Sequence, residues 1–384
     1  MTTPLQDSLR GVLEASWNER YGYTAPNPRK YPYQWLWDSC FHAISWSEYR
    51  DPRALRELES LFAAQLPSGF MPNVIYRPRS IASRTLWKNA LAGYSDITQP
   101  PMYGHAIRVL HDRGYNVSHL VGPARKGLYF LLRERRDPAT GLLRIIHPWE
   151  SGCDDLPRWD SWSHGRYHRT TWNIRKYYLL RRVKLDHGAS IANPAFSVDA
   201  ISFNALVAFN ARELAAVTGD KALAQQADEL ATAIDTTWDE VRSTWVDRTP
   251  DGTSRPSSAI RTLDALLPLL VSSNAAHRNA AWNAIFSPDE FLAPYGLRAV
   301  AKSEPAYAPD GYWRGGSWAQ MMYLLWVAAD REGHPRTKDL ARLLTKGVEA
   351  SKAAEHWNPE TGKGSGATPC GFSTLATVTA PTVQ

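Results

Sequence analysis

The chain has 384 residues, of which 43% are hydrophobic and 21% are charged, a composition typical of a globular protein with a sizeable core. Its net charge of +6 is small for this length, and no nucleic-acid-binding motif occurs, so the sequence argues against a partner that is DNA or RNA. No run of about 18 apolar residues is present, which argues against a membrane-spanning helix.

Apolar residues recur with helical spacing along most of the chain. Residues 1–23 alternate like an amphipathic helix and lack the basic and apolar segments of a signal peptide. The clearest helical patterns that follow are residues 52–66, 200–219, 221–241, 257–273, 274–286, 315–330 and 336–354. Strand-like alternation is confined to residues 71–76 and 142–147, and each of these fits an extended loop equally well.

Long linkers rich in Trp, Tyr and Pro separate these helices, at residues 68–103, 147–172 and 302–317. Long loops in a compact helical domain usually carry function. Neither a fixed sequence repeat nor a break in composition is visible. The sequence therefore predicts an all-α fold, an (α/α)6 toroid of six helical hairpins with aromatic loops on one face, and a single domain over residues 1–384.

Three cysteines, Cys40, Cys153 and Cys370, lie far apart in the sequence. An odd number without paired spacing argues against a disulfide framework and for a reducing compartment. We therefore expect a cytoplasmic protein.

The aromatic content is unusual, with 16 Trp and 17 Tyr against 10 Phe. Indole N–H and phenol O–H groups need partners when they are buried, so a core built for burial alone would favour Phe and Leu. A surface that binds sugars needs such rings, because sugars present apolar C–H faces and polar edges. Helical packing with amphipathic rims explains the composition equally well.

Two of four candidate site segments join aromatic residues to a candidate site acid. In "YPYQWLWDSCFHAI", from Tyr31, Trp35 and Trp37 would point to opposite sides of an extended lead-in, so that one lines a pocket. Asp38 then either caps the next helix or accepts sugar hydroxyls. In "EHWNPETGKGSG", Glu355 stands in a Gly-rich turn, where a lone Glu would more often be a cap.

The segment "ESGCDDLPRWD", from Glu150, holds four acids in eleven residues. Neighbouring carboxylates in a water-excluded pocket raise each other's pKa, which keeps one protonated as a general acid. The alternative is an acidic loop with helix caps and a salt bridge to Arg158. Together with Glu355, however, this loop supplies the two carboxyl groups that glycoside hydrolysis needs. A further segment, "DGYWRGGSW", places aromatic residues around a glycine pair, for which core packing is the alternative.

Taken in the order in which they occur along the chain, the four segments resemble motifs of glycoside hydrolase family 63, whose toroid is shared with trehalases. "WLWDSCF" is similar to W-x-W-D-[SA]-x-F, "ESGCDDLPRWD" to E-S-G-x-D-[ND]-x-P-R-W-D, "YWRGGSW" to Y-W-R-G-P-x-W, and "EHWNPETGKGSG" to E-x-[WY]-x-P-x-T-G-x-G. "YSDITQPP", around Gln99, resembles the small bacterial members that hydrolyse glucosylglycerate and mannosylglycerate.

The resemblance implies that Asp154 is the general acid and Glu355 the general base that activates water. It also implies inversion at the anomeric carbon, with the two carboxyl groups roughly 6.5–9.5 Å apart. The implied substrate-binding residues are Tyr31, Trp35, Trp37, Asp38, Gln99, Trp149, Arg158, Tyr312, Trp313 and Trp318. We expect Glu150 and Asp155 to orient Asp154 or Arg158, and we expect Asp160 and Glu360 to be structural.

Three features depart from the family pattern. Gly316 stands where the family has proline. Residues 77–97 are short and basic where the glycerate-sugar hydrolases have a mobile lid. The basic segment 166–184 reads mainly as a solvated helix face, from which Arg169 is best placed to grip a carboxylate on the aglycone by a bidentate pair.

The sequence thus predicts an inverting α-glycosidase that acts on a small α-glucoside or α-mannoside, with glycerate as an example of an acidic aglycone. No cofactor or metal is expected, because the eleven histidines are scattered and neither C-x-x-C nor a Gly-rich phosphate loop occurs. The expected partner is a small glycoside, not a nucleic acid or a membrane, and a homo-oligomer is left open.

Three alternatives remain. One is another carbohydrate enzyme on the same toroid: a trehalase-like hydrolase, an α-glucosidase, a phosphorylase or an epimerase. The presence of Glu355 argues against a phosphorylase, and the carboxylates of the motifs argue against an epimerase that uses histidines. The second is a sugar-binding protein that keeps the pocket without catalysis. The third is a structural or nucleic-acid-binding helical protein, which only the positive net charge favours.

Overall fold

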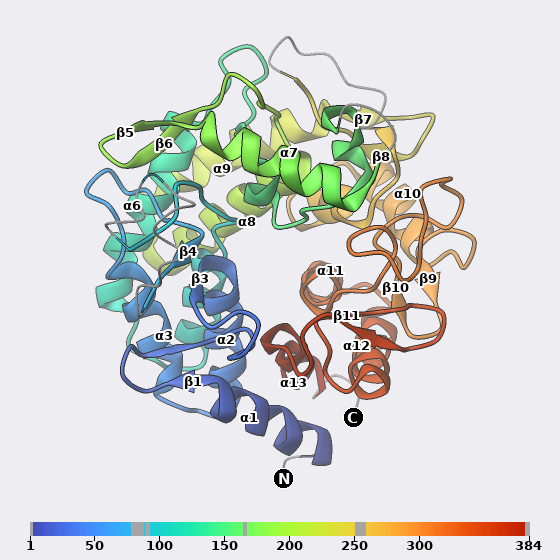
Figure 1. Ribbon diagram of the computed structural model, residues 1–384, viewed down its shortest axis with the longest axis horizontal. Helices are drawn as coiled ribbons and strands as arrows, with labels where there is room; N and C mark the ends of the chain where they lie inside the picture. Colours follow the sequence, from blue (N-terminus) through green and yellow to red (C-terminus); the bar gives the residue numbers. More distant parts are fainter. Residues whose placement is uncertain (1–2, 78–87, 89–92, 164–166, 250–258, 381–384) are drawn as a thin grey trace.

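The computed structural model describes residues 3–77, 88, 93–163, 167–249 and 259–380. Helices run around a central axis, and the chain ends beside its beginning (Figure 1). Most of residues 77–97, which depart from the family pattern, lie outside the described part. In the part of the chain that is described, no helix combines the length and hydropathy that crossing a bilayer requires.

Six segments form an inner ring. They are α2 (Leu36–Glu48), α5 (Tyr103–Asp112), α8 (Ile201–Thr218), the 3-10 helix η5 (Leu263–Leu270), α11 (Ala319–Glu332), and the 3-10 helix η6 (Gly371–Leu375) with α13 (Ala376–Thr379). Each contacts the next in this order, and η6 contacts α2, which closes the ring. These segments are buried on nearly all sides, as the run of buried residues in α2 illustrates.

An outer helix precedes each inner segment. The outer helices are α1 (Pro4–Ser16), α3 (Arg53–Phe62), α6 (Ser118–Glu134), α9 (Lys221–Asp235), α10 (Ala275–Ile285) and α12 (Thr337–Ser351). They bury one apolar stripe and expose the rest, as in α9, where Leu223, Leu230 and Ile234 face inward. The two rings together confirm the predicted (α/α)6 toroid.

Short elements complete the fold. Two-stranded antiparallel sheets are formed by β1 (Trp17–Asn18) with β2 (Tyr23–Thr24), β3 (Gln34–Trp35) with β4 (Val74–Ile75), β5 (Lys184–Asp186) with β6 (Ala189–Ala192), β7 (Trp238–Asp239) with β8 (Thr244–Trp245), β9 (Leu292–Ala293) with β10 (Gly296–Leu297), and β11 (His356–Trp357) with β12 (Gly364–Ser365). Helix α7 (Arg169–Arg181) and the 3-10 helices η2 (Pro148–Ser151) and η3 (Pro157–Trp162) lie in the long linker before α8.

The expected helix over residues 257–273 is replaced by the 3-10 helix η5, which contains Pro268. Proline lacks the N–H that an α-helix interior requires, so a regular helix is not continued there. The pattern over residues 221–241 likewise ends as a helix at Asp235, after which the chain forms the β7–β8 hairpin.

Candidate active site

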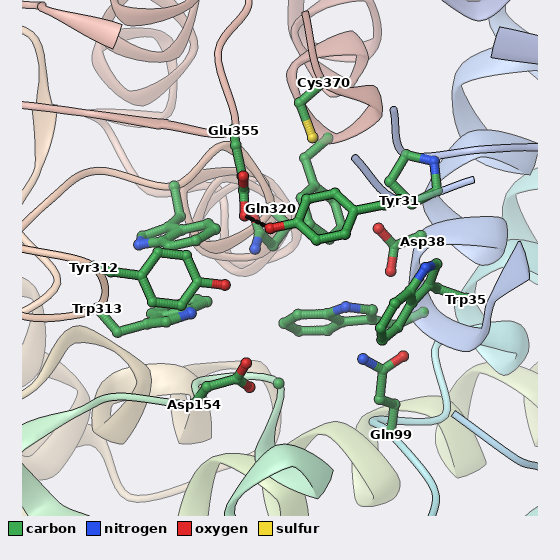
Figure 2. Close-up of a pocket in the computed structure, with 15 residues that line it drawn as sticks. Tyr31, Trp35, Asp38, Gln99, Asp154, Tyr312, Trp313, Gln320, Glu355 and Cys370 are labelled. Atoms are coloured by element: carbon green, nitrogen blue, oxygen red, sulfur yellow. Dashed lines mark hydrogen bonds between the residues drawn. The ribbon is translucent and has the colours of Figure 1, made fainter. Parts of the chain in front are cut away.

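One pocket gathers ten of the predicted site residues. It encloses about 520 Å³ and is lined by Pro26, Tyr31, Trp35, Trp37, Asp38, Gln99, Gly152, Asp154, Tyr312, Trp313, Trp318, Gln320, Glu355, Cys370 and Phe372 (Figure 2). Sequence analysis missed five of these: Pro26, Gly152, Gln320, Cys370 and Phe372. Gln320 follows Trp318 by two residues and Gly152 lies inside the acid motif, so proximity to the motifs was the available signal.

The pocket lies where inner segments begin. Asp38 is in the first turn of α2, Gln320 is in the first turn of α11, and Gln99 precedes α5 by four residues. The N-terminal ends of these inner segments therefore direct their side chains toward the same pocket. The positive ends of the helix dipoles point there as well. Closure of the ring therefore assembles residues from distant parts of the sequence.

Asp154 follows η2 on the acid loop, which we define as residues 147–163. The pKa of Asp154 is raised to about 7, mainly by burial and also by the charges of Asp155 and Glu355, while Lys176 opposes these effects. Its carboxyl still reaches the pocket (Figure 2). Gly152 has a φ of 74°, and a Cβ there would lie 2.4 Å from the ring of Trp37. The acid loop is thereby packed directly on α2.

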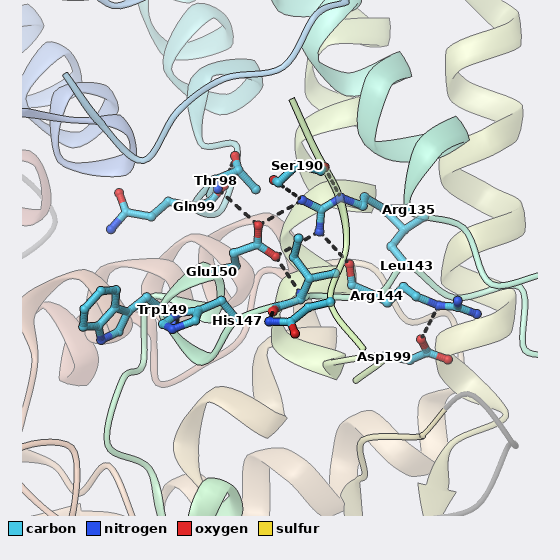
Figure 3. Close-up of polar contacts among 12 residues, drawn as sticks. Thr98, Gln99, Arg135, Leu143, Arg144, His147, Trp149, Glu150, Ser190 and Asp199 are labelled. Atoms are coloured by element: carbon cyan, nitrogen blue, oxygen red, sulfur yellow. Dashed lines mark hydrogen bonds and ion pairs between the residues drawn. The ribbon is translucent and has the colours of Figure 1, made fainter. Parts of the chain in front are cut away.

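We expected Glu150 to orient Asp154 or Arg158. Instead, its contacts anchor the start of the acid loop. It is fully buried and forms two 3.0 Å contacts with the guanidinium of Arg135. It also accepts hydrogen bonds from the backbone N–H groups of Thr98 at 3.2 Å and Ile146 at 2.8 Å (Figure 3). Since Thr98 precedes Gln99, this carboxylate joins the Gln99 segment to the acid loop.

Asp155 is paired elsewhere as well. Its carboxylate forms an ion pair with the buried ammonium of Lys176 on α7 and accepts a 3.4 Å hydrogen bond from Tyr167. It therefore influences Asp154 through charge, while its own position is fixed by α7.

The structure does not bring Arg158 to the pocket, which corrects its expected role in substrate binding. Its guanidinium is buried between Asp247 at 3.1 Å and Asp264 at 2.7 Å, and it donates to Ser202 at 2.8 Å. Two carboxylates and a hydroxyl face its two terminal nitrogens, so Arg158 stabilises the packing of η3 on the inner ring.

Two other expected binding residues also lie outside the lining. Trp149 packs against His147, with ring centroids 4.8 Å apart, and against Tyr177 on α7. Arg169, the first residue of α7, places its guanidinium carbon 5.7 Å from the ring centroid of Tyr312. Arg169 therefore adjoins a wall residue of the pocket, whereas Trp149 packs the acid loop against α7.

Glu355 enters the pocket from the side opposite Asp154 (Figure 2). The Tyr31 hydroxyl donates to its Oε1 at 2.9 Å, and Oε2 accepts from Lys30 Nζ at 2.9 Å and from the backbone N–H of Ala367 at 2.7 Å. Burial and the neighbouring Glu355 raise the pKa of Tyr31 far above its usual range, so Tyr31 keeps its proton and acts as a donor.

Several buried polar atoms of the pocket have no hydrogen-bond partner among the described residues. They are both amide atoms of Gln320, Nε1 of Trp35 and Trp318, and Oε1 of Gln99. Asp38 adds a buried carboxyl whose pKa is raised, first by burial and then by Glu355 and Asp154. Buried polar groups normally find partners, so this combination with aromatic rings suits a ligand with several hydroxyls.

Stacked rings form one wall. Trp313 and Trp318 are parallel with centroids 4.0 Å apart, and His356 stacks on Trp318 at 4.9 Å. Burial lowers the pKa of His356 to about 4, which keeps this ring neutral. A Cβ at Gly316 would lie 3.1 Å from Nδ1 of His356, so glycine at this position leaves space for the stacked imidazole. Among the described residues, no cluster of three or more His, Cys, Asp and Glu side chains is arranged to hold a metal ion.

Residues 31–373 match the family model of the mannosylglycerate hydrolase MGH1-like glycoside hydrolase domain. The chain belongs to this family. It is a glycoside hydrolase, and the resemblance to glycoside hydrolase family 63 is confirmed. The matched range contains Tyr31, Asp154 and Glu355, and thus spans both sides of the pocket.

Curated relatives match this glycoside hydrolase over nearly their whole length. A mannosylglycerate hydrolase of Thermus thermophilus is 27% identical, over 93% of this chain and 96% of its own. A glucosylglycerate hydrolase of Mycolicibacterium hassiacum is 25% identical, over 94% of each. Among solved structures, the mannosylglycerate hydrolase of T. thermophilus in complex with Tris and D-glycerate has a TM-score of 0.86 at 24% identity, covering 98% of this chain and 100% of that one.

The neutral trehalase of Saccharomyces cerevisiae shares the fold more distantly. Its TM-score is 0.61 at 15% identity, with 100% of this chain and 80% of that chain covered. Both structural likenesses support the (α/α)6 toroid.

Proposed function

We propose that this glycoside hydrolase cleaves a small α-mannoside or α-glucoside with an acidic aglycone, and that it inverts the anomeric carbon. The names of the relatives, which hydrolyse mannosylglycerate or glucosylglycerate, support this substrate class. The observation that carries the proposal is the pair of carboxyl groups, Asp154 and Glu355, on opposite sides of one aromatic pocket.

The two carboxyl groups differ in the way that an acid and a base require. Asp154, with a pKa of about 7, holds a proton near neutral pH and donates it to the glycosidic oxygen as the bond from the anomeric carbon breaks. Glu355 faces an ammonium and two other donors, and it accepts a proton from the water that attacks the opposite face of the sugar. The transition state resembles an oxocarbenium ion.

The remaining pocket groups bind the sugar. Trp35, Trp313 and Trp318 contribute aromatic surface, while Asp38 and the open amide of Gln320 take hydroxyls. Arg169, beside Tyr312, grips the carboxylate of the aglycone. Closure of the ring, in which α1 packs on η6, supports residues 1–384 as a single catalytic domain.

A substrate panel tests the proposal: mannosylglycerate, glucosylglycerate, trehalose, kojibiose and nigerose, with free sugar measured for the wild type, Asp154→Asn and Glu355→Gln. We expect a glycerate glycoside to give the highest kcat/KM, and each variant to lose about 10²- to 10⁴-fold on it. Preference for trehalose would contradict the substrate class, and near-full activity of either variant would contradict its catalytic role.

A further inference from the structure

Arg314 connects the stacked wall of the pocket to the acid loop. Its Nη1 lies 2.7 Å from Oδ1 of Asp160 and its Nη2 lies 2.8 Å from Oδ2, which is a bidentate pair. Nη1 also donates to the backbone carbonyl of Asp155 at 3.3 Å. The guanidinium carbon covers the ring of Tyr167 at 3.9 Å. The planar guanidinium can pair with a carboxylate and lie on an aromatic ring in only one orientation, and the ammonium of a lysine cannot reproduce it.

These contacts join two segments that are 154 residues apart in the sequence. On one side, Arg314 directly follows Trp313, which forms the stacked wall with Trp318. On the other side, the carbonyl that it binds belongs to the residue next to Asp154. A displacement of Arg314 is therefore transmitted both to the wall that holds the sugar and to the acid that protonates it.

The backbone at this point is held in an unusual conformation. Trp313 has a φ of 58°, which a bulky residue rarely adopts. The turn is closed by hydrogen bonds from Arg314 N to Gly311 O at 3.0 Å and from Ala308 N to Arg314 O at 2.9 Å. A Cβ at Gly315 would lie 2.7 Å from Ala308 O, so the turn is tightly packed. Strained backbone persists only where its surroundings fix it, and it gathers at functional sites.

We infer that Arg314, through Asp160, is a positioning residue that sets the distance between the proton of Asp154 and the glycosidic oxygen of a sugar stacked on the wall. This inference rests on the proposed function, because it assigns Asp154 as the acid. It changes the reading of Asp160, which the sequence suggested was only structural. A displacement of about 1 Å at such a point costs up to about 100-fold in rate.

The test compares two substrates with the same sugar: the glycerate glycoside and a dinitrophenyl α-glycoside, whose leaving group needs little protonation. For Arg314→Lys and Asp160→Asn we expect kcat on the glycerate glycoside to fall by about 10- to 100-fold. On the dinitrophenyl glycoside the fall should be several times smaller, with KM little changed for both. Two independent variants keep the test valid if one of them folds poorly.

Arg298→Lys is the matched control. Arg298 forms an ion pair with Glu360, at 2.6 Å, and neither residue lines the pocket. Any decrease in kcat caused by Arg298→Lys should be equal for both substrates. Equal losses for both substrates in Arg314→Lys and Asp160→Asn would overturn the positioning role.

Asp154→Asn, measured alongside, separates this outcome from failure of the proposed function. If it loses activity mainly on the glycerate glycoside, the acid is correctly assigned and a uniform loss in Arg314→Lys overturns the inference alone. If it keeps full activity on both substrates, the proposed function falls and the positioning role falls with it.

Discussion

The hydroxyl of Tyr31 donates a 2.9 Å hydrogen bond to one oxygen of Glu355, while Lys30 and the N–H of Ala367 hold the other oxygen. The first oxygen is thus oriented by a single neutral donor, and the second by a cation and the backbone. A base that must receive a proton from water in one direction benefits from such fixed orientation.

Removing the Tyr31 hydroxyl should therefore impair chemistry more than binding. For Tyr31→Phe we expect kcat to fall by roughly 10-fold, in the range of one lost hydrogen bond to a charged group, with KM within a few-fold. Steady-state kinetics on the preferred glycoside measures both. A variant that raises KM and leaves kcat unchanged would show instead that Tyr31 serves the sugar.

The pH profile reports Asp154. Its protonated form is the active one, so kcat/KM should fall as the pH rises through about 7. Asp155→Asn removes a charge that raises the pKa of Asp154 and leaves the opposing Lys176 unpaired, so the basic limb should move to lower pH. Glu360→Gln, which alters a distant pair with Arg298, should leave the limb in place. A shift of the limb to higher pH in Asp155→Asn would contradict the assignment.

The raised pKa of Asp154 also predicts a stability cost. Between pH about 4 and about 7 the folded protein binds this proton more tightly than the unfolded chain, so stability falls as the pH rises through that range. Asp154→Asn removes the cost, and its Tm should exceed that of the wild type at pH 8 by on the order of 2 °C or more. The gain should vanish near pH 4.

Asp186→Asn, an exposed position on β5, is the control for this measurement. Differential scanning calorimetry at both pH values gives the comparison. A Tm difference for Asp154→Asn that is the same at both values would contradict the titration argument.

Arg169 is predicted to recognise the charge of the aglycone. Arg169→Gln should raise KM for a glycerate glycoside by about 10-fold or more, since hydrogen bonds to charged groups contribute about 1.5–3 kcal/mol. The methyl glycoside of the same sugar should be unaffected. Arg175→Gln alters another arginine of α7, which stacks on Tyr178, and should change neither KM. Equal effects of Arg169→Gln on the charged and uncharged glycosides would exclude this role.

The helical periodicity was sufficient to predict the toroid, because its outer helices need one apolar stripe each. It was insufficient for η5, where Pro268 interrupts an otherwise helical pattern. The positions of α5 and α6 were not anticipated, since their apolar residues are interrupted by His, Arg and Gly.

Within the site, short motifs predicted the residues that line the pocket because aromatic and acidic types stand out there. They could not separate Arg158, which binds two carboxylates, from a pocket arginine. The partners Asp247 and Asp264 lie about a hundred residues away in the sequence, and only folding brings them together. Gln320 was missed for a related reason. Its side-chain amide is recognised as a candidate ligand-binding group only when the structure shows that it is buried without a hydrogen-bond partner among the described residues.

The most direct test of the account is proton NMR of the first sugar released from the preferred glycerate glycoside by the wild-type enzyme. If Asp154 donates the proton and Glu355 activates water on the opposite face, the β-anomer appears first and the α-anomer follows by mutarotation. Initial release of the α-anomer would contradict the central claim, because retention requires a carboxylate that attacks the sugar directly.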